Sequence, residues 1–217
     1  MDGNGRWAKQ RHLPRLAGHR AGVEAVRRVS RAARAMGIEA LTLYAFSSEN
    51  WRRPAAEVSD LMGLLRLFIR SDLAELAREN VRLRVIGDYR RFAPDLVALV
   101  DDAVARTAAN TGPILAIALN YGAQAELAAA ARRLAERLPP EQIDEAAIEA
   151  ELETRELPPL DLLIRSSGEM RLSNFLLWQA AYAELLFVET LWPDFDEAAL
   201  ADAVAQFGLR QRRYGGL

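Results

Sequence analysis

The sequence contains no cysteine, a single lysine (Lys9) and only two histidines in 217 residues. The absence of cysteine excludes disulfides, thiolate zinc sites and cysteine nucleophiles, and it favours a location in the reducing cytoplasm. No apolar run approaches the roughly 20 residues that cross a bilayer, so no transmembrane segment is expected. The polar opening residues do not resemble a secretory signal. A net charge of −2 lacks the basic excess of a general nucleic-acid binder, so no nucleic-acid partner is expected.

The residues that are present have ordinary globular proportions, with 51% hydrophobic and 27% charged. This length and composition predict a single domain over residues 1–217 with a substantial core. Short apolar runs alternate with helical periodicity, which is typical of an α/β fold with a mostly parallel sheet covered on both faces. The predicted strands span 41–46, 81–86, 114–119, 160–164 and 185–188. The predicted helices span 20–36, 57–80, 94–110, 126–138, 141–154 and 197–210.

The predicted helix 57–80 is apolar over more than half of its circumference, which is wider than one core-facing stripe requires. Its apolar residues are Leu61, Met62, Leu64, Leu65, Leu67, Phe68, Ile69, Leu73 and Leu76. One face should therefore meet the sheet and the other a second apolar surface. That surface can be a tunnel for a long hydrocarbon, another helix or a dimer contact, and periodicity alone does not choose among them.

The most informative motif is the opening segment Asp2-Gly3-Asn4-Gly5-Arg6. Glycines at alternate positions let the backbone approach a ligand closely and point N–H groups at one spot, so the segment is predicted to be a loop that grips a diphosphate. Asp2 can hold a divalent cation on that phosphate, and Arg6 can neutralise the remaining charge. The segment also fits the G-x-G-x-x-A dinucleotide fingerprint with Glu24 as the ribose acid, but the strand that should precede that fingerprint is absent from the sequence.

Two polar segments extend this prediction. Arg15, His19 and Arg20 lie one turn apart near a helix start, where they can close around the same anion or form a solvated basic face. The segment 47–53 follows a predicted strand and can close over bound ligand as a lid. Its alternative interpretation is a helix N-terminus capped by Ser48.

A third cluster places Arg165, Arg171 and Ser173 around a glycine turn after another predicted strand. In parallel sheets ligands bind at the carboxyl ends of the strands, so this cluster predicts a second anion site at the same edge. Two anion sites suggest a reaction that joins two phosphorylated substrates. Two unit charges 4 Å apart interact by about 4 kcal/mol at a surface-like dielectric, so two diphosphates require several cations between them.

Eight sequence blocks carry a resemblance to a known family. They are Met1-Asp-Gly-Asn-Gly-Arg-Trp-Ala8, Gly18-His19, Tyr44-Ala-Phe-Ser-Ser-Glu-Asn-Trp51, Asn120-Tyr-Gly122, Arg165-Ser-Ser-Gly-Glu169, Arg171-Leu-Ser-Asn-Phe-Leu-Leu-Trp-Gln179, Tyr182-Ala-Glu184 and Trp192-Pro-Asp-Phe195. In this order and over nearly the whole chain, the sequence resembles the cis-prenyltransferases, and in particular the bacterial undecaprenyl diphosphate synthases.

The resemblance implies an α/β fold with an apolar substrate tunnel and a Mg²⁺-dependent transferase. Such an enzyme condenses isopentenyl diphosphate with an allylic diphosphate, usually farnesyl diphosphate. The implied product is a long-chain cis-polyprenyl diphosphate such as undecaprenyl diphosphate, used for cell-wall lipid carriers. A homodimer is also implied, with transient membrane contact compatible with product release. The alternatives are a short-chain cis-prenyl diphosphate synthase and a non-catalytic accessory subunit.

By matching position, the resemblance assigns roles to individual residues. Asp2 and Asn50 would be catalytic, and Asp2 and Glu184 would bind Mg²⁺. The substrate-binding residues would be Gly3, Asn4, Gly5, Arg6, Trp7, Arg15, His19, Ser47, Ser48, Glu49, Trp51, Arg53, Arg165, Arg171, Leu172 and Ser173. A neutral amide is a far weaker base than a carboxylate or a diphosphate oxygen, so we expect Asn50 to position substrate while Asp2 or a diphosphate oxygen takes the proton.

The sequence departs from the family pattern at three places, one of which is Ala123-Gln124 after the Asn-Tyr-Gly block, where the family usually has Gly-Arg. The family has a strand ahead of the block that opens this chain, so a first strand is expected to be missing before residue 1. Met170 stands where some members carry a histidine proposed as a metal ligand, and a thioether is a poor ligand for Mg²⁺. The family's C-terminal Arg-x-Gly, here Arg213-Tyr214-Gly215, would reach the partner's isopentenyl site.

Overall fold

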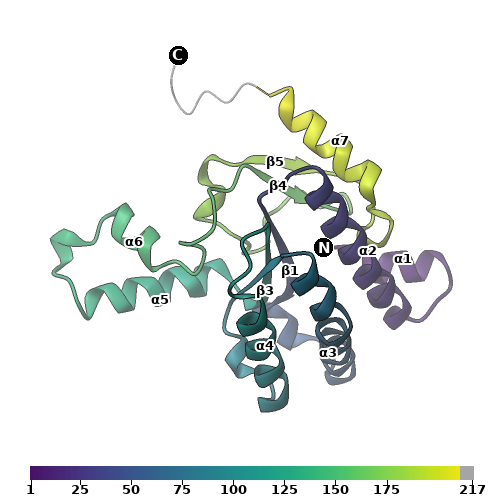
Figure 1. Cartoon of the computed structure of the whole chain (residues 1–217), viewed down its shortest axis with the longest axis horizontal. Helices are drawn as coiled ribbons and strands as arrows, with labels where there is room; N and C mark the ends of the chain where they lie inside the picture. The colour runs from purple at the N-terminus through teal and green to yellow at the C-terminus, as the bar shows by residue number, and fades with distance from the viewer. Residues whose placement is uncertain (211–217) are drawn as a thin grey trace.

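The computed structural model describes residues 1–210, and its helices and strands alternate along the chain (Figure 1). The helices are α1 (Asn4–Gln10), α2 (Arg15–Ala35), α3 (Ala55–Arg78), α4 (Pro94–Thr107), α5 (Ala123–Ala135), α6 (Glu145–Glu151) and α7 (Glu197–Gly208). The strands are β1 (Ala40–Ser47), β2 (Arg82–Ile86), β3 (Ile114–Tyr121), β4 (Leu162–Arg165) and β5 (Glu184–Phe187). Two short 3₁₀ helices, η1 (Ser48–Arg52) and η5 (Trp192–Asp194), also contribute to the site.

All strand pairs in the described residues are parallel, as predicted, but they form two separate sheets. One sheet has the order β1-β3-β2, and the other pairs β4 with β5. In the first, Leu43 lies opposite Ile117 and Leu83 opposite Leu115. In the second, Leu162 lies opposite Glu184, at the end of the sheet where both strands begin. The carboxyl end of β4 therefore lies three positions further along the sheet than Glu184.

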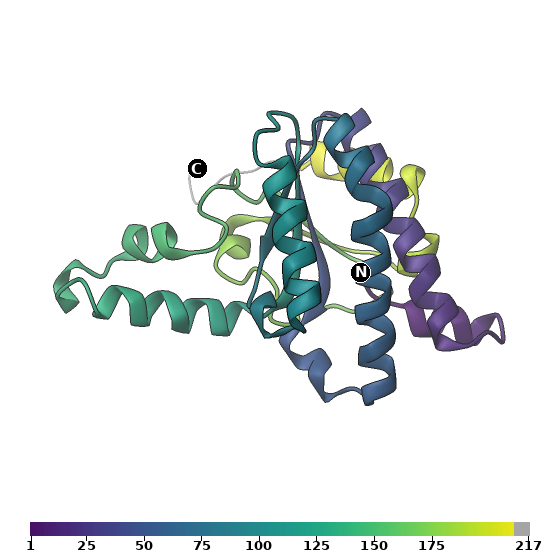
Figure 2. The same ribbon diagram turned by 60° about the horizontal axis from the view of Figure 1, so that its bottom comes forward.

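The two faces of the larger sheet are covered differently. Leu43, Leu83 and Ile117 point into the main core, where they meet α2, α3 and α4. Those three helices lie side by side (Figure 2). The opposite face carries Ile86, Tyr121 and other residues that pack against the segment around Leu176. Both faces are covered, as predicted, but the second is covered by a loop.

The two longest helices are joined by charged groups as well as by the core. Arg27 on α2 donates hydrogen bonds to both carboxylate oxygens of Asp72 on α3, each at 2.7 Å. Asp72 is buried, so this pair holds the two helices together where little water screens it. Glu24, the ribose acid of the dinucleotide alternative, also pairs with Arg27.

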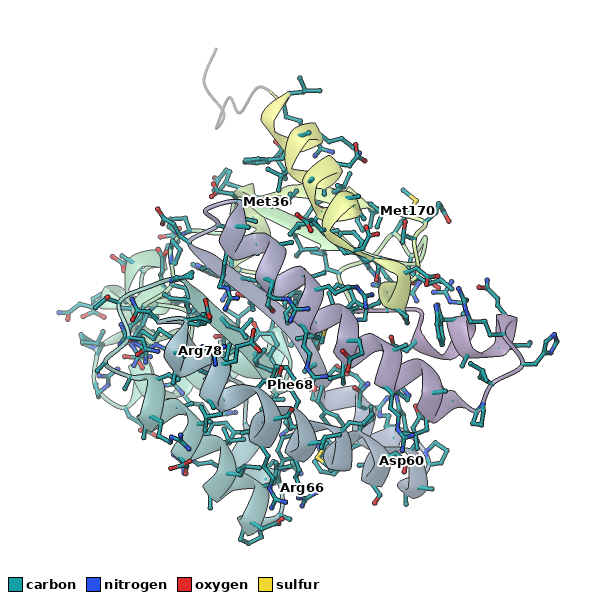
Figure 3. The ribbon with its side chains drawn as sticks, turned by 45° about the vertical axis from the view of Figure 1, so that its right-hand side comes forward. Met36, Asp60, Arg66, Phe68, Arg78 and Met170 are labelled. Atoms are coloured by element: carbon teal, nitrogen blue, oxygen red, sulfur yellow. The ribbon has the colours of Figure 1, made fainter. Side chains whose placement is uncertain are left out.

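Helix α3 separates an apolar side from a charged one, as Figure 3 illustrates. Phe68 packs against the main core, whereas Asp60 is exposed and Arg66 pairs with Asp95 of α4. Leu67 is the exception, because 60% of it is exposed. None of the helices among residues 1–210 is long and apolar enough to cross a membrane.

Helices α5 and α6 form an arm that extends away from the sheets (Figures 1 and 2). Arg133 of α5 donates to a carboxylate oxygen of Glu151 at 2.8 Å and thereby holds the two helices of the arm together. At the root of the arm, the Tyr121 hydroxyl donates to Glu126 at 2.6 Å in a buried contact. This hydrogen bond ties the arm to the end of β3.

Candidate active site

The glycine-rich opening segment is a helix N-terminus, which corrects the prediction of a loop. Gly3 precedes α1 with φ of 100°, a left-handed conformation that a side chain rarely adopts. Two glycines of α2 then let α1 approach closely. A Cβ at Gly18 would lie 2.0 Å from the Asn4 carbonyl oxygen, and one at Gly22 would lie 2.6 Å from the Asn4 side-chain oxygen. The glycines therefore fix the position of Asn4 against α2.

A polar pocket of about 620 Å³ opens beside this helix junction. It is lined by Met1, Asp2, Gly3, Asn4, Gly5, Arg6, Lys9, His12, Leu13, Arg15, His19 and Arg53. The predicted allylic diphosphate residues are thus brought together, with the exception of Trp7. Lys9, His12 and Leu13 were not predicted, although they lie close to the glycine motif in the sequence. Arg20 is exposed and does not line the pocket.

An apolar cavity of about 120 Å³ adjoins the polar pocket. It lies among α2, α3, β1 and β3, and Val26, Ala45 and Phe68 are among its lining residues. The polar pocket and the apolar cavity share Met1, Asn4 and His19. An elongated ligand with a charged head and an apolar tail would fit across this junction.

Two buried polar atoms at the junction lack a hydrogen-bond partner. They are the side-chain oxygen of Asn4 and Nε2 of His19. Buried polar atoms in folded proteins are almost always paired, and exceptions often mark ligand sites. Their position at the boundary of pocket and cavity indicates that a bound polar group belongs there.

Asp2 is held at the edge of the polar pocket by contacts to the β4–β5 sheet. Its Oδ2 accepts a hydrogen bond from Arg165 at 3.0 Å, and its Oδ1 accepts the amide hydrogen of Gly3 at 2.7 Å. Its backbone N–H donates to the Ser166 hydroxyl at 3.0 Å. Burial disfavours the carboxylate, but the hydrogen bonds from Arg165 and Gly3 outweigh it and lower the pKa of Asp2. With 41% of its side chain exposed, Asp2 presents a charged and accessible carboxylate.

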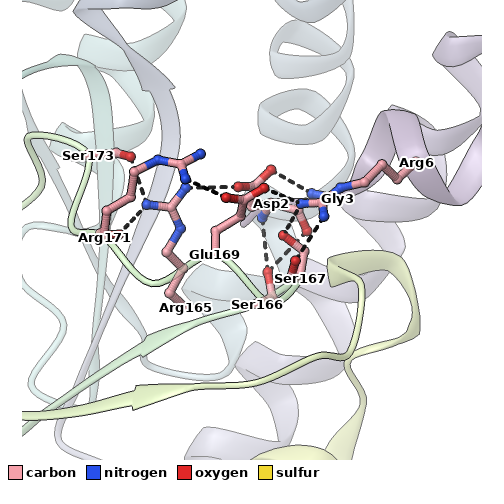
Figure 4. Close-up of polar contacts among 9 residues, drawn as sticks. All are labelled: Asp2, Gly3, Arg6, Arg165, Ser166, Ser167, Glu169, Arg171 and Ser173. Carbon is pink, nitrogen blue, oxygen red and sulfur yellow. Dashed lines mark hydrogen bonds and ion pairs between the residues drawn. The ribbon is translucent and has the colours of Figure 1, made fainter.

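The residues of the second predicted anion site lie beside Asp2. Arg165, the last residue of β4, reaches Asp2, the backbone oxygen of Arg171 and the hydroxyl of Ser173 (Figure 4). The contact to Ser173 measures 2.7 Å. Because the Arg165 guanidinium contacts both Asp2 and Ser173, the two predicted sites are neighbours that share Asp2 at their boundary.

Glu169 connects Arg6 of the first cluster with Arg171 of the second. It was not predicted as a site residue. Glu169 pairs with Arg6 at 3.2 Å and also with Arg171 (Figure 4). Arg6 further donates to the backbone oxygen of Ser167 at 2.9 Å and to its hydroxyl at 2.6 Å. Ser167 and Glu169 lie in the quoted Arg165–Glu169 block, so the signal was available in the sequence.

Glu57, a second unpredicted carboxylate, gathers two arginines and a histidine of the polar pocket. Its Oε1 lies 3.2 Å from Arg15, 2.8 Å from Arg53 and 3.5 Å from Nε2 of His19. Only 10% of its side chain is exposed. Burial lowers the pKa of His19 despite the nearby Glu57, so its imidazole is largely neutral at neutral pH.

The predicted lid segment forms the short helix η1 at the carboxyl end of β1. The Asn50 side-chain oxygen accepts the amide hydrogen of Ser47 at 3.2 Å, which caps η1. Trp51 donates from its ring nitrogen to the side-chain oxygen of Asn120 at 2.8 Å. The alternative interpretation of a helix N-terminus is therefore confirmed in part, but the cap of η1 is Ser47 and not Ser48, and Pro54 immediately precedes α3.

Apart from the segment 47–51, three predicted residues lie outside the two clusters. Trp7 donates from its ring nitrogen to Asp194 of η5 at 2.7 Å. The Leu172 carbonyl oxygen accepts the amide hydrogen of Phe175 in a turn. Glu184 begins β5 and pairs with Arg210 at 2.6 Å, at the far end of the small sheet from Arg165. The structure therefore does not bring Glu184 to Asp2 within one chain.

Metal-ligating groups are sparse in the described part of the chain. No three histidine, aspartate or glutamate side chains among residues 1–210 are grouped to hold a metal ion. Met170, which stands at the family's histidine position, is 79% exposed (Figure 3). Mg²⁺ is commonly held by one or two carboxylates together with substrate phosphates and water, and the exposed carboxylate of Asp2 meets that requirement.

Comparisons with known proteins identify the family of this chain. The family model described as "Putative undecaprenyl diphosphate synthase" matches residues 1–215. An isoprenyl transferase from Zymomonas mobilis is 61% identical over 222 aligned positions, which cover 100% of this chain and 90% of that protein. An isoprenyl transferase from Rhizobium meliloti is 58% identical with the same coverage.

Two solved structures share the fold. The lavandulyl diphosphate synthase of Lavandula x intermedia, crystallised with dimethylallyl diphosphate, superposes with a TM-score of 0.95 at 37% identity, covering 99% of this chain and 95% of that one. A "probable undecaprenyl diphosphate synthase" of Campylobacter jejuni superposes with a TM-score of 0.80 at 33% identity, covering 90% and 92%.

Fold, site and relatives together define a prenyltransferase, an α/β enzyme whose parallel strands end at two adjoining clusters of cationic side chains. The chain belongs to the cis-prenyltransferase family, that of undecaprenyl diphosphate synthase, and is an isoprenyl transferase.

Proposed function

We propose that this enzyme condenses isopentenyl diphosphate with farnesyl diphosphate and repeats the step to make a long-chain cis-polyprenyl diphosphate such as undecaprenyl diphosphate. The observation that carries the proposal is the junction at Asn4 and His19, where a cationic pocket opens into an apolar cavity. An allylic diphosphate has this same division into a charged head and an apolar tail. The product would serve cell-wall lipid-carrier synthesis in the cytoplasm.

The two cationic clusters divide the substrates between them. Arg6, Arg15, His19 and Arg53 would hold the allylic diphosphate, because they line the pocket that continues into the apolar cavity. The cluster of Arg165, Arg171 and Ser173 would hold the diphosphate of isopentenyl diphosphate. Guanidinium groups suit this role because they bind phosphate oxygens in pairs and remain charged.

Asp2 is proposed to bind Mg²⁺ at the boundary of the two sites. When bound, the ion would stabilise the negative charge on the departing allylic diphosphate. Asp2 itself is kept ionised by Arg165 and Gly3, and it is also a candidate to take the proton lost from isopentenyl diphosphate. Within one chain, Glu184 lies away from Asp2. It would therefore bind the Mg²⁺ at Asp2 only if a second copy of the chain supplied it.

Asn50 is proposed to position substrate. Its side-chain oxygen accepts a hydrogen bond from Ser47 and so fixes the start of η1. An amide engaged in this way is a poor proton acceptor, in line with the weak basicity of amides. Ser47, Ser48, Glu49 and Trp51 would act through the same short helix.

A short-chain cis-prenyl diphosphate synthase is the second candidate, and the size of the cavity favours it. A cavity of roughly 150 Å³ holds one benzene molecule, so a volume of about 120 Å³ holds a group about the size of one five-carbon unit. The similarity to lavandulyl diphosphate synthase supports the same candidate. A long product would require α2 and α3 to move apart.

One experiment separates the two candidates. The protein is incubated with Mg²⁺, farnesyl diphosphate and labelled isopentenyl diphosphate, and the products are sized by chromatography. A series of products extending to long chains is expected. Products that stop after one or two additions would establish the short-chain enzyme, and no incorporation with either farnesyl or dimethylallyl diphosphate would contradict both proposals.

A homodimer is also proposed from the family resemblance. The residues Arg213-Tyr214-Gly215, which the resemblance assigns to the partner's isopentenyl site, lie outside the described residues.

A further inference from the structure

Three of the sequence blocks converge on Asn174, a residue to which no role was assigned. Its side-chain nitrogen donates to Oε1 of Glu49 at 2.9 Å. Its side-chain oxygen accepts the amide hydrogen of Gln124 at 2.8 Å, and its carbonyl oxygen accepts that of Ala123 at 2.9 Å. Asn174 therefore connects η1, the start of α5 and the loop after β4.

The backbone around Asn174 is shaped for this contact. Ser173 and Asn174 have φ of 48° and 61°, a left-handed conformation that asparagine tolerates better than most residues. Gly122 leaves the necessary space, because a Cβ there would lie 2.7 Å from the Asn174 side-chain nitrogen and 2.7 Å from the Ser48 hydroxyl. A side chain at position 122 would separate the two loops.

On one side of Asn174 lies the second cationic cluster. Ser173, its neighbour in sequence, accepts a hydrogen bond from Arg165 at 2.7 Å. On the other side lies the helix that carries Asn50, since Glu49 immediately precedes Asn50. A second bond, from Trp51 to Asn120, attaches the far end of η1 to the end of β3. Only the bond to Asn174 connects η1 to the loop of the second cluster among the hydrogen bonds of the described residues.

We propose that Asn174 is a positioning residue that couples the Arg165–Ser173 cluster to Asn50 through its hydrogen bond to Glu49. A diphosphate bound by Arg165 and Ser173 would fix the loop that carries Asn174, and that loop would then fix η1. The enzyme would thereby place Asn50 when the second substrate is present. The inference rests on the proposed function, because it takes isopentenyl diphosphate as the ligand of this cluster.

The chain allows a nearly isosteric test of this bond. Asn174→Asp keeps the oxygen that accepts from Gln124 but replaces the donor to Glu49 with a second oxygen, so two carboxylates face one another. Adding Glu49→Gln restores the hydrogen bond in the opposite direction, because the amide at position 49 now donates and the carboxylate at position 174 accepts. Asn110→Asp is the matched control, because Asn110 also donates from its side chain, to the Val81 carbonyl oxygen at 2.7 Å, and takes no part in the site.

Two measurements are made on each variant. The first is kcat and the KM of each substrate. The second is deuterium uptake of residues 47–53 with and without isopentenyl diphosphate alone, which allows no turnover. We expect Asn174→Asp to lower kcat by about tenfold to a hundredfold, the usual effect of losing a hydrogen bond to a charged group, with a smaller change in either KM. We also expect it to abolish the protection of residues 47–53 by isopentenyl diphosphate.

The double variant Asn174→Asp/Glu49→Gln should regain most of the kcat and most of the protection of residues 47–53. Asn110→Asp should lose neither. If Asn174→Asp does not fold, Glu49→Ala removes the same bond from the exposed side and should reproduce the loss. An unchanged Asn174→Asp, or a double variant no better than the single one, would overturn the coupling. If the wild-type protein shows protection but no turnover, the coupling stands and the proposed function fails.

Discussion

At the scale of single residues, the site depends on charges that neutralise one another before any substrate arrives. Asp2 pairs with Arg165, Glu169 with Arg6 and Arg171, and Glu57 with Arg15, Arg53 and His19. Each arginine is therefore held near its working position by a carboxylate, which reduces the conformational entropy lost on binding. A diphosphate must then compete with these carboxylates for the same guanidinium groups.

Replacing Asp2 tests the residue at the boundary of the two clusters. Asp2→Asn preserves the acceptor for the Gly3 amide but removes the charge that would bind Mg²⁺. Turnover should fall by about a hundredfold or more, as expected when a group that stabilises transition-state charge is lost, while the thermal unfolding midpoint changes little. Asp194→Asn is the control, because Asp194 binds Trp7 and Arg11 away from the polar pocket. Near-normal turnover of Asp2→Asn would dismiss the metal role.

His19 gives the site a pH dependence whose sign follows from its environment. Burial lowers its pKa in the folded protein below the ordinary value of 6.5. As the pH falls below 6.5, the unfolded chain takes up the proton first, so the contribution of neutral His19 to stability is present above that pH and is lost below it. A bound diphosphate would bring negative charge close to His19. Negative charge favours the protonated imidazole, so the pKa of His19 should rise.

Diphosphate binding near pH 6 should therefore take up protons through His19. Calorimetric titration with inorganic diphosphate in two buffers of different ionisation enthalpy measures this uptake. His19→Gln serves as the reference, because it subtracts the protons exchanged by the diphosphate itself. Equal proton exchange in the wild type and in His19→Gln would refute the expectation.

At the scale of elements, the contact between α1 and α2 determines the shape of the polar pocket. Gly18→Ala would place a methyl group 2.0 Å from the Asn4 carbonyl oxygen, so α1 would have to move. We expect a loss of about 1–3 kcal/mol in the free energy of unfolding together with weaker diphosphate binding. Chemical denaturation and calorimetry measure the two effects.

Gly63→Ala on α3 is the matched control for that substitution. A Cβ at Gly63 meets nothing within 4 Å, so alanine there should raise the free energy of unfolding by about 0.5–1 kcal/mol through its helix propensity. If Gly18→Ala stabilised the protein to the same extent, the close approach of α1 and α2 would not shape the pocket.

Most elements were predictable because their sequence signals are local. The strands and the helices α3, α4 and α7 are confirmed within a few residues, since apolar periodicity reflects burial directly. Helix α1 was missed because Gly3 and Gly5 favour a loop locally, whereas contact with α2 stabilises a helix. The roles of Glu57 and Glu169 were missed because each also pairs with a residue far away in the sequence, Glu57 with Arg15 and Glu169 with Arg6, and periodicity does not report tertiary contacts.

At the scale of the whole molecule, the sequence resemblance located the site but not every distance within it. The Asp2 and Arg165 clusters were predicted to lie at one edge of a sheet, and the structure places them in contact through the pair of Asp2 with Arg165. Glu184 was assigned by its motif position, but the parallel register of β4 and β5 places it opposite Leu162, away from Arg165. Strand register depends on packing in three dimensions, so a motif alone could not supply this distance.

The proposed homodimer can be tested by mixing inactive subunits. Asp2→Ala and Arg213→Ala chains are expected to be inactive separately. If Arg213 acts in the partner's site, each mixed dimer contains one site with both residues intact. Random mixing in equal amounts should then restore about a quarter of the wild-type activity, because half of the dimers have one working site of two. No recovery after verified subunit exchange would place Arg213 in its own chain's site, and an active Arg213→Ala chain would place it outside catalysis.

The pair formed by Arg27 and Asp72 has a mechanical consequence for product length. The apolar cavity is lined by both helices that this pair joins, so under the proposed function a lengthening hydrocarbon would have to force them apart. Asp72→Asn would weaken the contact with Arg27 and should shift the products to greater length on chromatography. An unchanged distribution of product lengths would show that another feature limits them. Under the proposed elongation, synthesis would end when separating α2 from α3 costs more free energy than burying another isoprene unit provides.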